Sequence, residues 1–567
     1  MGSHVTQVRT ERDRPSEDTV TRAKHQLLVL VGACLLLALP AVCRAATFTV
    51  TRLDDTNPPT GNLGDLRSAI NSANAAGGAG NAIVFSMSGT ITLSATLPPI
   101  TSNLIITGPI AIDGNNTFQI MQINSGANVT LQSLTLTEGS AVGPAVTVGE
   151  GGAILNQGTL TISDCTLSNN QATGGVGSGS SGGGSGAGGG IFNQGGALTI
   201  TNSTLSNNQA TGGADGGLGG GPSFGGGIYN NNGATLTIAG STLTCNQAIG
   251  GAGGVGAAGD SRGGAIYNLG TLTITNSTIA CNDAFGGSGG SADGFGSGGA
   301  LFNSGAATAT ITNATYWGNE AINGDGSDGV GGGIYDPGGT NLKGTILAAS
   351  TGGNCGGTIP AARYSIADDN SCFTNGSNNN IVVTHTSDIG LASGLANNGG
   401  PTETIALEGG GMANALIAAP CTDQSSNPLS TDQRGFPRPA PSHVTSCSAG
   451  AFEYNPPFFN GEVSNGNQLY NLTFANSTFF GYYSYEFYPW LYQYDLGFEY
   501  VVDANDGASG VDLYDTSLGS YLYTNPNDFP YFWDYASSSW LYYYAETSRY
   551  FYEFGGMGRG YFFSPQG

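Results

Sequence analysis

A short motif recurs six times in this chain and constrains its fold more than any other feature. Each copy contains two small residues, an aliphatic residue, a bulky residue and a final amide or acid. The copies are GAILN, GGIFN, GGIYN, GAIYN, GALFN and GGIYD, at residues 152–156, 189–193, 226–230, 264–268, 299–303 and 332–336. Their final residues are 37, 37, 38, 35 and 33 positions apart. This period predicts a repeat array in which each unit stacks on the next.

Each repeat contains three short β-rich runs, for example residues 265–268, 271–274 and 278–282. The alternation in the second run, TLTI, places its aliphatic side chains inward and its threonines outward. Three strands per turn, repeated in register, predict an all-β parallel β-helix, or solenoid. Two amide positions recur once per turn and predict ladders of hydrogen-bonded side chains, the first of which ends at Asp336. The positions are Asn156, Asn193, Asn230, Asn268 and Asn303, and Asn170, Asn208, Asn246, Asn282 and Asn319.

The N-terminal part of the chain predicts a secretion signal followed by a cap. Residues 1–45 contain an apolar run at 27–39, which is shorter than the ~20 residues that span a membrane, and a small-residue exit before Ala46. We therefore expect a signal peptide at 1–45 and a secreted protein. Residues 46–82 contain an amphipathic helix at 66–74, which suits an N-terminal cap over the first turn.

Composition divides the rest of the chain into three regions. Residues 83–350 are the predicted β-helix, and their Gly-rich stretches predict flexible loops at one corner. Residues 351–456 are the predicted end of the β-helix, stabilised by disulfides. Residues 457–567 hold 19 of the 25 Tyr and three of the four Trp, and predict a small domain of aromatic β-hairpins.

Seven of the nine cysteines follow the predicted signal peptide. Cys355 with Cys372, and Cys421 with Cys447, are the natural loop-closing pairs in an oxidising compartment. Cys245 and Cys281 lie one repeat apart, so they could form a disulfide between neighbouring turns or a stack of reduced thiols. Cys165 falls elsewhere in the repeat and is the expected free thiol.

Several motifs together resemble secreted bacterial β-helix proteins. These are LRSAI at 66–70, the repeated GGIYN turns, and the ending formed by DQRG at 432–435 and GAFEY at 450–454. The chain resembles the chlamydial polymorphic outer-membrane protein repeats, with a CSLREA-like cap and a choice-of-anchor-Q-like ending. The cap departs from that pattern at Gly64, Asp65 and Ser68. The resemblance implies a right-handed parallel β-helix at the cell surface or beyond it, and implies no catalytic residues.

Charge and composition exclude some classes of partner. The formal charge of −24 repels a phosphate backbone, so nucleic acid is not an expected partner. No metal or cofactor motif stands out, and membrane association would require an anchor that the sequence does not identify. Carbohydrate and surface proteins remain the expected partners.

The predicted β-helix offers few groups for catalysis. Between residues 83 and 350 there is no His, and the basic residues are Arg262 and Lys343. The acids appear isolated in sequence, although neighbouring turns could bring two together; they include Asp113, Asp164, Asp215 and Asp283. A glycosidase needs two facing carboxylates, and a lyase needs a base and a calcium cluster. We therefore expect an adhesin-like protein without catalysis, with a polysaccharide lyase or glycoside hydrolase as the alternative.

The bulky position of the motif supplies the candidate ligand-binding residues. Alternation places this column opposite the aliphatic column, so its rings could stack on sugars or on a partner. Alternatively, the Gly-rich loops cover the rings or the rings fill the core, which is favoured because long exposed aromatic patches are rare. The candidates are Phe192, Tyr229, Tyr267, Phe302 and Tyr335.

Overall fold

The computed structural model describes residues 45–567, apart from several short segments. Those segments are 57–59, 79, 338, 358, 419, 441–444, 455–462, 465–468, 474–478, 488–489, 494–495, 504–510, 517, 526–527, 545–549, 555–560 and 564–567. The predicted signal peptide, except for Ala45, lies outside the described residues.

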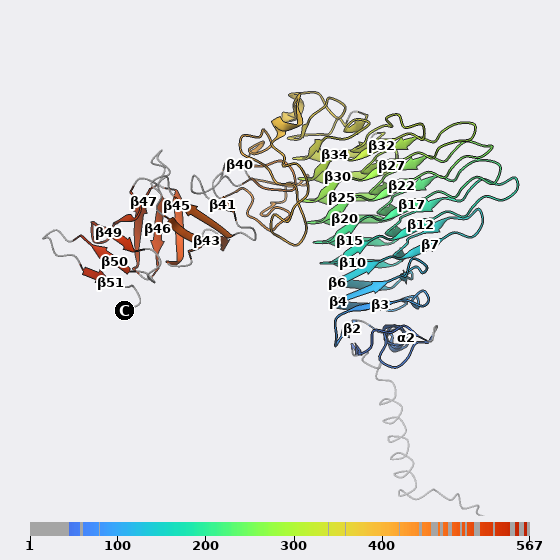
Figure 1. Ribbon diagram of the computed structural model, residues 1–567, viewed down its shortest axis with the longest axis horizontal. Helices are drawn as coiled ribbons and strands as arrows, with labels where there is room; N and C mark the ends of the chain where they lie inside the picture. Colours follow the sequence, from blue (N-terminus) through green and yellow to red (C-terminus); the bar gives the residue numbers. More distant parts are fainter. Residues whose placement is uncertain are drawn as a thin grey trace, which may run out of the picture.

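The chain forms the predicted parallel β-helix, capped at its first turn by one helix (Figure 1). The cap helix α2 (Leu66–Ala76) begins after Asp65, whose carboxylate accepts a hydrogen bond from the backbone N–H of Ser68 at 2.7 Å. An N-terminal acid of this kind satisfies a helix donor that has no partner within the helix. Arg67 is 1% exposed and donates to both oxygens of Asp55, at 2.8 and 2.7 Å, so the cap buries a paired charge.

Four parallel sheets build the solenoid, and each turn of the coil, or rung, in its middle part contributes to all of them. The long sheet has two strands per rung over most of its length. Its strands are β1 (Thr47–Val50), β2 (Asn81–Phe85), β3 (Thr90–Thr92), β4 (Leu104–Asp113), β6 (Asn128–Thr137), β10 (Thr159–Ser163), β11 (Thr166–Ser168), β15 (Ala197–Thr201), β16 (Thr204–Ser206), β20 (Thr235–Ala239), β21 (Thr242–Thr244), β25 (Thr271–Thr275), β26 (Thr278–Ala280), β30 (Thr308–Thr312), β31 (Thr315–Trp317), β34 (Thr340–Lys343), β35 (Ile346–Ala348), β37 (Ile366–Ala367) and β38 (Ile381–Val382).

The motif sheet contains the six motif copies and one strand at each end. Its strands are β5 (Met121–Ile123), β9 (Ile154–Asn156), β14 (Ile191–Asn193), β19 (Ile228–Asn230), β24 (Ile266–Asn268), β29 (Leu301–Asn303), β33 (Ile334–Tyr335) and β36 (Cys355–Gly356). In every rung the motif aliphatic, such as Ile228, is completely or almost completely buried, as predicted.

Two short sheets flank the Gly-rich loops, and the sequence analysis did not separate their strands. The corner sheet precedes the loops: β7 (Ser140–Val142), β12 (Gln171–Thr173), β17 (Gln209–Thr211), β22 (Gln247–Ile249), β27 (Asp283–Phe285) and β32 (Glu320–Ile322). The loop-base sheet follows them: β8 (Gly149–Glu150), β13 (Gly186–Ala187), β18 (Ser223–Phe224), β23 (Ser261–Arg262) and β28 (Gly296–Ser297). A complete rung therefore has five short strands instead of the three that the sequence predicted.

Both predicted amide ladders are present and buried. In the first, Asn156 donates to Asn193 at 2.8 Å, and the same bond repeats through Asn230, Asn268 and Asn303. The ladder ends at Asp336, as predicted: this carboxylate accepts from Asn303 at 2.9 Å and from two backbone N–H groups. The second ladder runs from Asn170 to Asn319 with side-chain bonds of 2.8–3.0 Å. Each rung is thus tied to the next at two corners.

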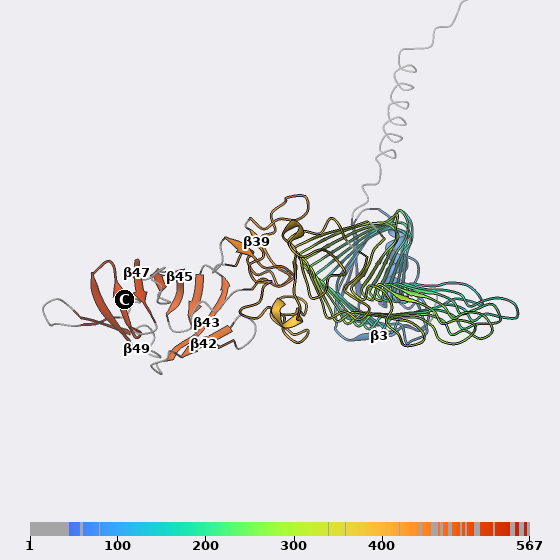
Figure 2. The same cartoon turned by 90° about the horizontal axis from the view of Figure 1, so that it is seen from above.

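The Gly-rich loops are packed against one another, which corrects the expectation of flexible loops. They extend side by side from one edge of the solenoid (Figures 1 and 2). Their glycines form a continuous chain of backbone hydrogen bonds: Gly213 donates to Gly184, Gly221 to Gly213 and Gly251 to Gly221, each at 2.8 Å. We call this assembly the loop stack. Because bonds connect neighbouring loops, the loops do not move independently.

The end of the solenoid contains both predicted disulfides. Cys355 pairs with Cys372 and Cys421 with Cys447, with Cα–Cα distances of 4.9 and 6.1 Å. This region also contains two 3-10 helices, η1 (Ser377–Asn379) and η2 (Thr386–Ile389), and an antiparallel pair, β39 (Ile417–Ala418) and β40 (Ser446–Cys447).

The DQRG and GAFEY motifs attach the end of this region to the side of the solenoid. Gln433 is 2% exposed and accepts a hydrogen bond from Thr278 Oγ1 at 2.7 Å, while its Nε2 donates to Thr242 and Thr402 at 2.9 Å. Arg438 and Glu453 form a buried ion pair at 3.1 Å. These motifs therefore act as a clamp between distant parts of the chain.

We expect Gln433→Ala to release this clamp. The substitution removes at least three buried hydrogen bonds, which should cost about 2 kcal/mol and increase local opening roughly thirtyfold. Trypsin should then cut after Arg434 correspondingly faster; Arg438 is followed by Pro439 and is not a trypsin site. Asn427→Ala, which removes an exposed bond to Asp423, is the matched control. Equal cleavage rates in the two variants would contradict the clamp.

The C-terminal region forms one antiparallel, aromatic-rich sheet whose strands follow in sequence order, consistent with the predicted hairpins. Its interior contains Phe480, Phe532 and Phe551, whereas Tyr543 is buried and its neighbour Tyr544 is exposed. The strands are β41 (Val463–Ser464), β42 (Leu469–Thr473), β43 (Phe479–Phe487), β44 (Trp490–Gln493), β45 (Gly497–Asp503), β46 (Val511–Asp515), β47 (Ser520–Thr524), β48 (Tyr531–Asp534), β49 (Ser539–Tyr544), β50 (Tyr550–Glu553) and β51 (Tyr561–Phe563).

Candidate functional site

The five aromatic candidates form one stacked column on the outer face of the motif sheet. The ring centroids of consecutive members are 4.6, 5.1, 5.3 and 4.7 Å apart, from Phe192 through Tyr229, Tyr267 and Phe302 to Tyr335. Phe192 and Tyr267 are buried, and the other three are half-buried. The column is therefore neither in the core nor fully exposed.

The loop-base sheet covers part of this column. Phe224 packs against Tyr267 with ring centroids 4.8 Å apart, and the Arg262 guanidinium lies 5.6 Å from the Phe302 ring centre. Burial raises the pKa of Tyr229 to about 12. Because the ring faces contact each other, they offer little area for stacking on a sugar. Ligand binding by the column stays a prediction, and this geometry does not favour it.

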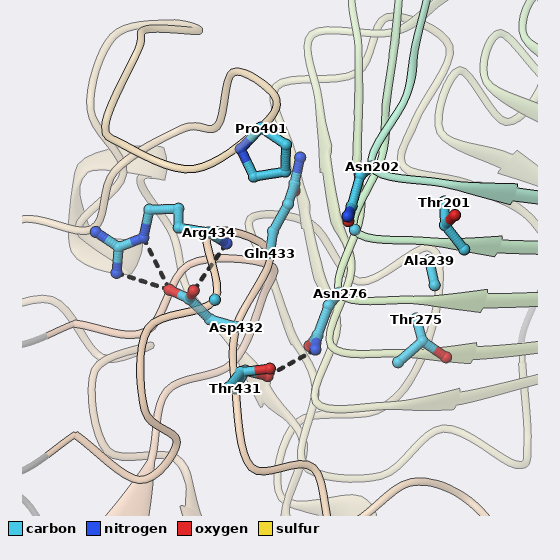
Figure 3. A pocket seen from close by; sticks show the side chains of 12 residues that line it. Thr201, Asn202, Ala239, Thr275, Asn276, Pro401, Thr431, Asp432, Gln433 and Arg434 are labelled. Atoms are coloured by element: carbon cyan, nitrogen blue, oxygen red, sulfur yellow. Dashed lines mark hydrogen bonds and ion pairs between the residues drawn. The ribbon is translucent and has the colours of Figure 1, made fainter. Parts of the chain in front are cut away.

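A second candidate site is the cleft between the solenoid and the DQRG segment, which we call the terminal cleft (Figure 3). Its volume is about 470 Å³. The solenoid side consists of corner residues from three consecutive rungs, and the opposite side is residues 431–435 together with Pro401. The lining residues are Thr201, Asn202, Ala239, Gly240, Thr275, Asn276, Pro401, Thr431, Asp432, Gln433, Arg434 and Gly435.

The corner positions in the cleft have left-handed backbone conformations, which explains their residue types. Asn202, Gly240 and Asn276 have φ of 49°, 59° and 44°. Glycine and asparagine are the residues that adopt this region most readily. The fold thus places two amide side chains at the wall of the cleft, one on each side of a glycine.

The amide of Asn276 has an acceptor without a partner. Its Nδ2 donates to Thr431 O at 2.7 Å, but its Oδ1 is buried and receives no hydrogen bond. Arg434 is directed toward Asp432 and Phe452 instead: its Nη2 lies 2.6 Å from the Asp432 carboxylate, and its guanidinium lies 3.5 Å from the Phe452 ring centre. The cleft therefore offers neutral polar groups, with its two charged side chains paired to each other.

Neighbouring rungs bring one pair of carboxylates together, which the sequence analysis had left open. Asp283 and Glu320 are register partners on adjacent strands of the corner sheet. Burial raises the pKa of Asp283 to about 6, with a further contribution from Glu320. The sequence carried a signal for this pair, because the two residues lie 37 positions apart, one repeat length.

Another acid holds two loops of the loop stack together. The Asp215 carboxylate accepts hydrogen bonds from the backbone N–H groups of Gly217 and Gly219 in its own loop. It also accepts from Gly254, Val255 and Gly256 in the next loop. These bonds hold the pKa of Asp215 well below its usual value. This carboxylate is fully engaged in the structure of the loop stack.

Asp283 should make the stability of the solenoid depend on pH. The pKa of Asp283 is raised in the folded state, so the protonated acid is the form that the fold favours. Its stabilising contribution is fully present below the unfolded pKa near 4 and is lost as pH rises through about 6. We expect Asp283→Asn to match the wild type at about pH 4 and to be about 1–2 kcal/mol more stable at about pH 7.5, allowing for solvent screening. Denaturant unfolding at both pH values measures this difference, and the same difference at both would refute the assignment.

Comparison with known proteins gives no closer identification: no protein-family model matches the chain, and no curated protein matches it. Within the described residues, no group of three or more His, Cys, Asp and Glu side chains is arranged to hold a metal ion. In that same part of the chain, no helix has the length and apolar character needed to cross a membrane. The fold and the geometry of its surfaces therefore carry the functional argument.

Proposed function

We propose that this chain is a secreted or cell-surface protein of adhesin type that binds neutral carbohydrate in the terminal cleft without catalysis. The observation that carries the proposal is the buried, unpartnered Oδ1 of Asn276 among other amides and hydroxyls. A buried acceptor without a hydrogen bond is costly, and a sugar hydroxyl could satisfy it. Asn202 supplies both a donor and an acceptor on the same wall.

Electrostatics favour a neutral ligand over an acidic one. The charged residues that line the cleft, Asp432 and Arg434, pair with each other, so the described lining leaves no cation for a uronic acid. The net charge of −24 would also repel a polyanion. Neutral polysaccharide chains are thus the ligand class that the cleft suits best.

Three features support a location outside the cytoplasm. The predicted signal peptide directs secretion, and the two disulfides suit an oxidising compartment. The resemblance to the chlamydial polymorphic outer-membrane protein repeats, with the choice-of-anchor-Q-like ending, supports a cell-surface role. In this proposal the clamp motifs serve to form one wall of the cleft.

The alternative function is glycoside hydrolysis, and one observation favours it. Asp283, with its pKa raised to about 6, faces the second carboxylate of Glu320, and such a pair can divide the roles of acid and base. The pair lies on the corner sheet, whereas the terminal cleft lies along the long sheet. The two proposals therefore depend on different residues and can be separated by substitution.

Binding measurements with Asn202→Gly and Asn276→Gly test the proposed site. Glycine keeps the left-handed backbone, as Gly240 does at the same position of the intervening rung, and it removes the amide. We expect each substitution to weaken binding to a neutral polysaccharide about tenfold, equivalent to one lost hydrogen bond. Asn207→Gly, the same change at a left-handed corner outside the cleft lining, is the control. Unchanged binding in both cleft variants would reject this site.

A further inference from the structure

Cys245 and Cys281 occupy the same corner position in consecutive rungs. The residues before them, Thr244 and Ala280, are register partners. The residues after them, Asn246 and Asn282, are joined by a side-chain hydrogen bond of 2.9 Å. Pairing on both sides holds the two Cα atoms near the strand spacing of ~4.8 Å. That separation falls within the ~4.4–6.8 Å over which a disulfide can form.

The backbone at this corner gives no reason for cysteine. Cys245 and Cys281 have φ of 53° and 55°, in the left-handed region that L side chains rarely adopt. Other rungs use Glu138, Asn169, Asn207, Gly318 and Ala349 at the same position, with φ between 53° and 59°. Several residue types fill this position, and asparagine and glycine adopt its conformation most readily, so the fold alone does not favour two neighbouring cysteines here.

The surroundings make the two thiols unequal. Both are half-buried, and a hydrogen bond from Cys281 lowers the pKa of Cys245 to about 6. The pKa of Cys281 is raised by the same hydrogen bond, by burial, and by the negative charges of Cys245, Asp283 and Glu320. Gln247 and Thr244, which also lie at this corner, are neutral. Cys245 is therefore the thiol that loses its proton more readily, and Cys281 is the one that retains it.

We propose that Cys245 and Cys281 form a redox site that closes a third disulfide between adjacent rungs by exchange with a small-molecule disulfide. The Cys245 thiolate attacks one sulfur of glutathione disulfide, breaks its S–S bond and releases one glutathione thiolate. Cys281 then loses its proton and attacks Cys245 Sγ, which releases the second glutathione. The two protein thiols are oxidised, and the glutathione disulfide is reduced to two thiols. This site is independent of the carbohydrate cleft.

Cys165 provides a comparison within the same chain. It is 3% exposed, and burial raises its pKa to about 11. The residue at the same position of the next rung is Ser203, whose Oγ accepts from the Cys165 N–H at 3.0 Å. Cys165 should therefore remain a thiol under conditions that oxidise the other pair.

The position of Arg262 makes the proposed bond directly measurable. Trypsin separates Cys245 from Cys281 by cutting after Arg67, Arg262 and Lys343, giving fragments 68–262 and 263–343. The folded protein is treated with glutathione disulfide and is then unfolded in the presence of an alkylating agent, so that every remaining thiol, including the buried Cys165, is blocked. It is then digested and analysed by mass spectrometry without reduction. We expect the two fragments to remain joined through Cys245 and Cys281, with Cys165 alkylated.

Variants identify which thiols form the bond. Cys245→Ser should abolish the joined fragments, whereas Cys165→Ser should leave them unchanged. The Cys355–Cys372 bridge, which joins two other tryptic fragments, is the internal control for digestion and oxidation. The proposal is overturned if Cys245 and Cys281 are both alkylated after oxidation, or if Cys245 retains a stable glutathione adduct without joining Cys281.

Discussion

Replacing Asn230 with alanine is expected to lower the free energy of unfolding of the solenoid by about 3–4 kcal/mol. The amide is fully buried, accepts from Asn193 at 2.8 Å and donates to Asn268 at 2.7 Å. Alanine removes both bonds and leaves the buried amides of Asn193 and Asn268 with one hydrogen bond fewer each. Most of the lost stability comes from buried polar groups that are left without a partner. Chemical denaturation followed by circular dichroism measures the effect.

Two further variants test whether the loss of stability comes from the hydrogen bonds of the ladder. One removes an exposed amide, and the other keeps the side-chain volume at position 230 but introduces a charge. Asn232→Ala, at an exposed position in the following turn, should change stability by less than about 0.5 kcal/mol. Asn230→Asp should be at least as damaging as alanine at neutral pH, because a buried carboxylate cannot donate to Asn268. Its folded-state pKa should be raised, so stability should recover as pH falls and the acid regains a proton to donate. An Asn230→Asp variant as stable as the wild type at neutral pH would contradict the ladder.

Gly221→Ala is expected to cost about 3 kcal/mol or more locally, because the loop stack has no space for a methyl group. A Cβ at Gly221 would lie 1.9 Å from Gly184 O, in the backbone of the neighbouring loop. Gly221 does not have a left-handed φ, so closeness and not backbone conformation requires glycine here. Hydrogen exchange should accelerate at Gly213, in the substituted loop, and at Gly251, in the next loop.

Gly195→Ala is the control for this substitution. A Cβ at Gly195 meets no atom within 4 Å, and its φ is not left-handed. Alanine there should be neutral or slightly stabilising, because it restricts the unfolded chain. If Gly221→Ala leaves exchange at Gly213 and Gly251 unchanged, the loops are not packed as the structure describes.

The sequence predicted those parts of the fold that repeat with the rung period. The buried Ile228 column and the ladder through Asn230 follow from alternation and spacing alone, because identical rungs place identical side chains in register. Asp336 marked the end of the ladder because an ionised acid cannot donate. The disulfide between Cys355 and Cys372 was predicted from their short separation in sequence and the expected compartment.

The order of the loop stack could not be predicted in the same way. Gly-rich composition indicates flexibility for a single chain, but stacking brings Gly251 N within hydrogen-bonding distance of Gly221 O in the neighbouring loop and fixes the loops together. That outcome depends on the spacing between rungs, which composition does not contain. The corner strands, such as β27, were missed because three residues are too few to show a period.

The two candidate sites differ in whether they can be predicted from the sequence. The Asp283–Glu320 pair could have been found by counting one repeat length from each acid. The terminal cleft joins Asn202 and Asn276 to Gln433, and no spacing rule connects a repeat with a segment that folds back onto it. The aromatic column is partly covered by the loop-base sheet, so Tyr229 offers less accessible surface to a ligand than the cleft does.

The most direct test of the proposed function measures binding and turnover on the same polysaccharides. The mature chain is incubated with a panel of soluble neutral polysaccharides and with a uronic-acid polymer, and bound mass and polymer length are both followed. We predict binding to a neutral member at unchanged length, weakened by Asn276→Gly and retained by Asp283→Asn, with no binding to the acidic polymer. Release of oligosaccharides that is lost in Asp283→Asn would contradict the proposal and establish the hydrolase instead.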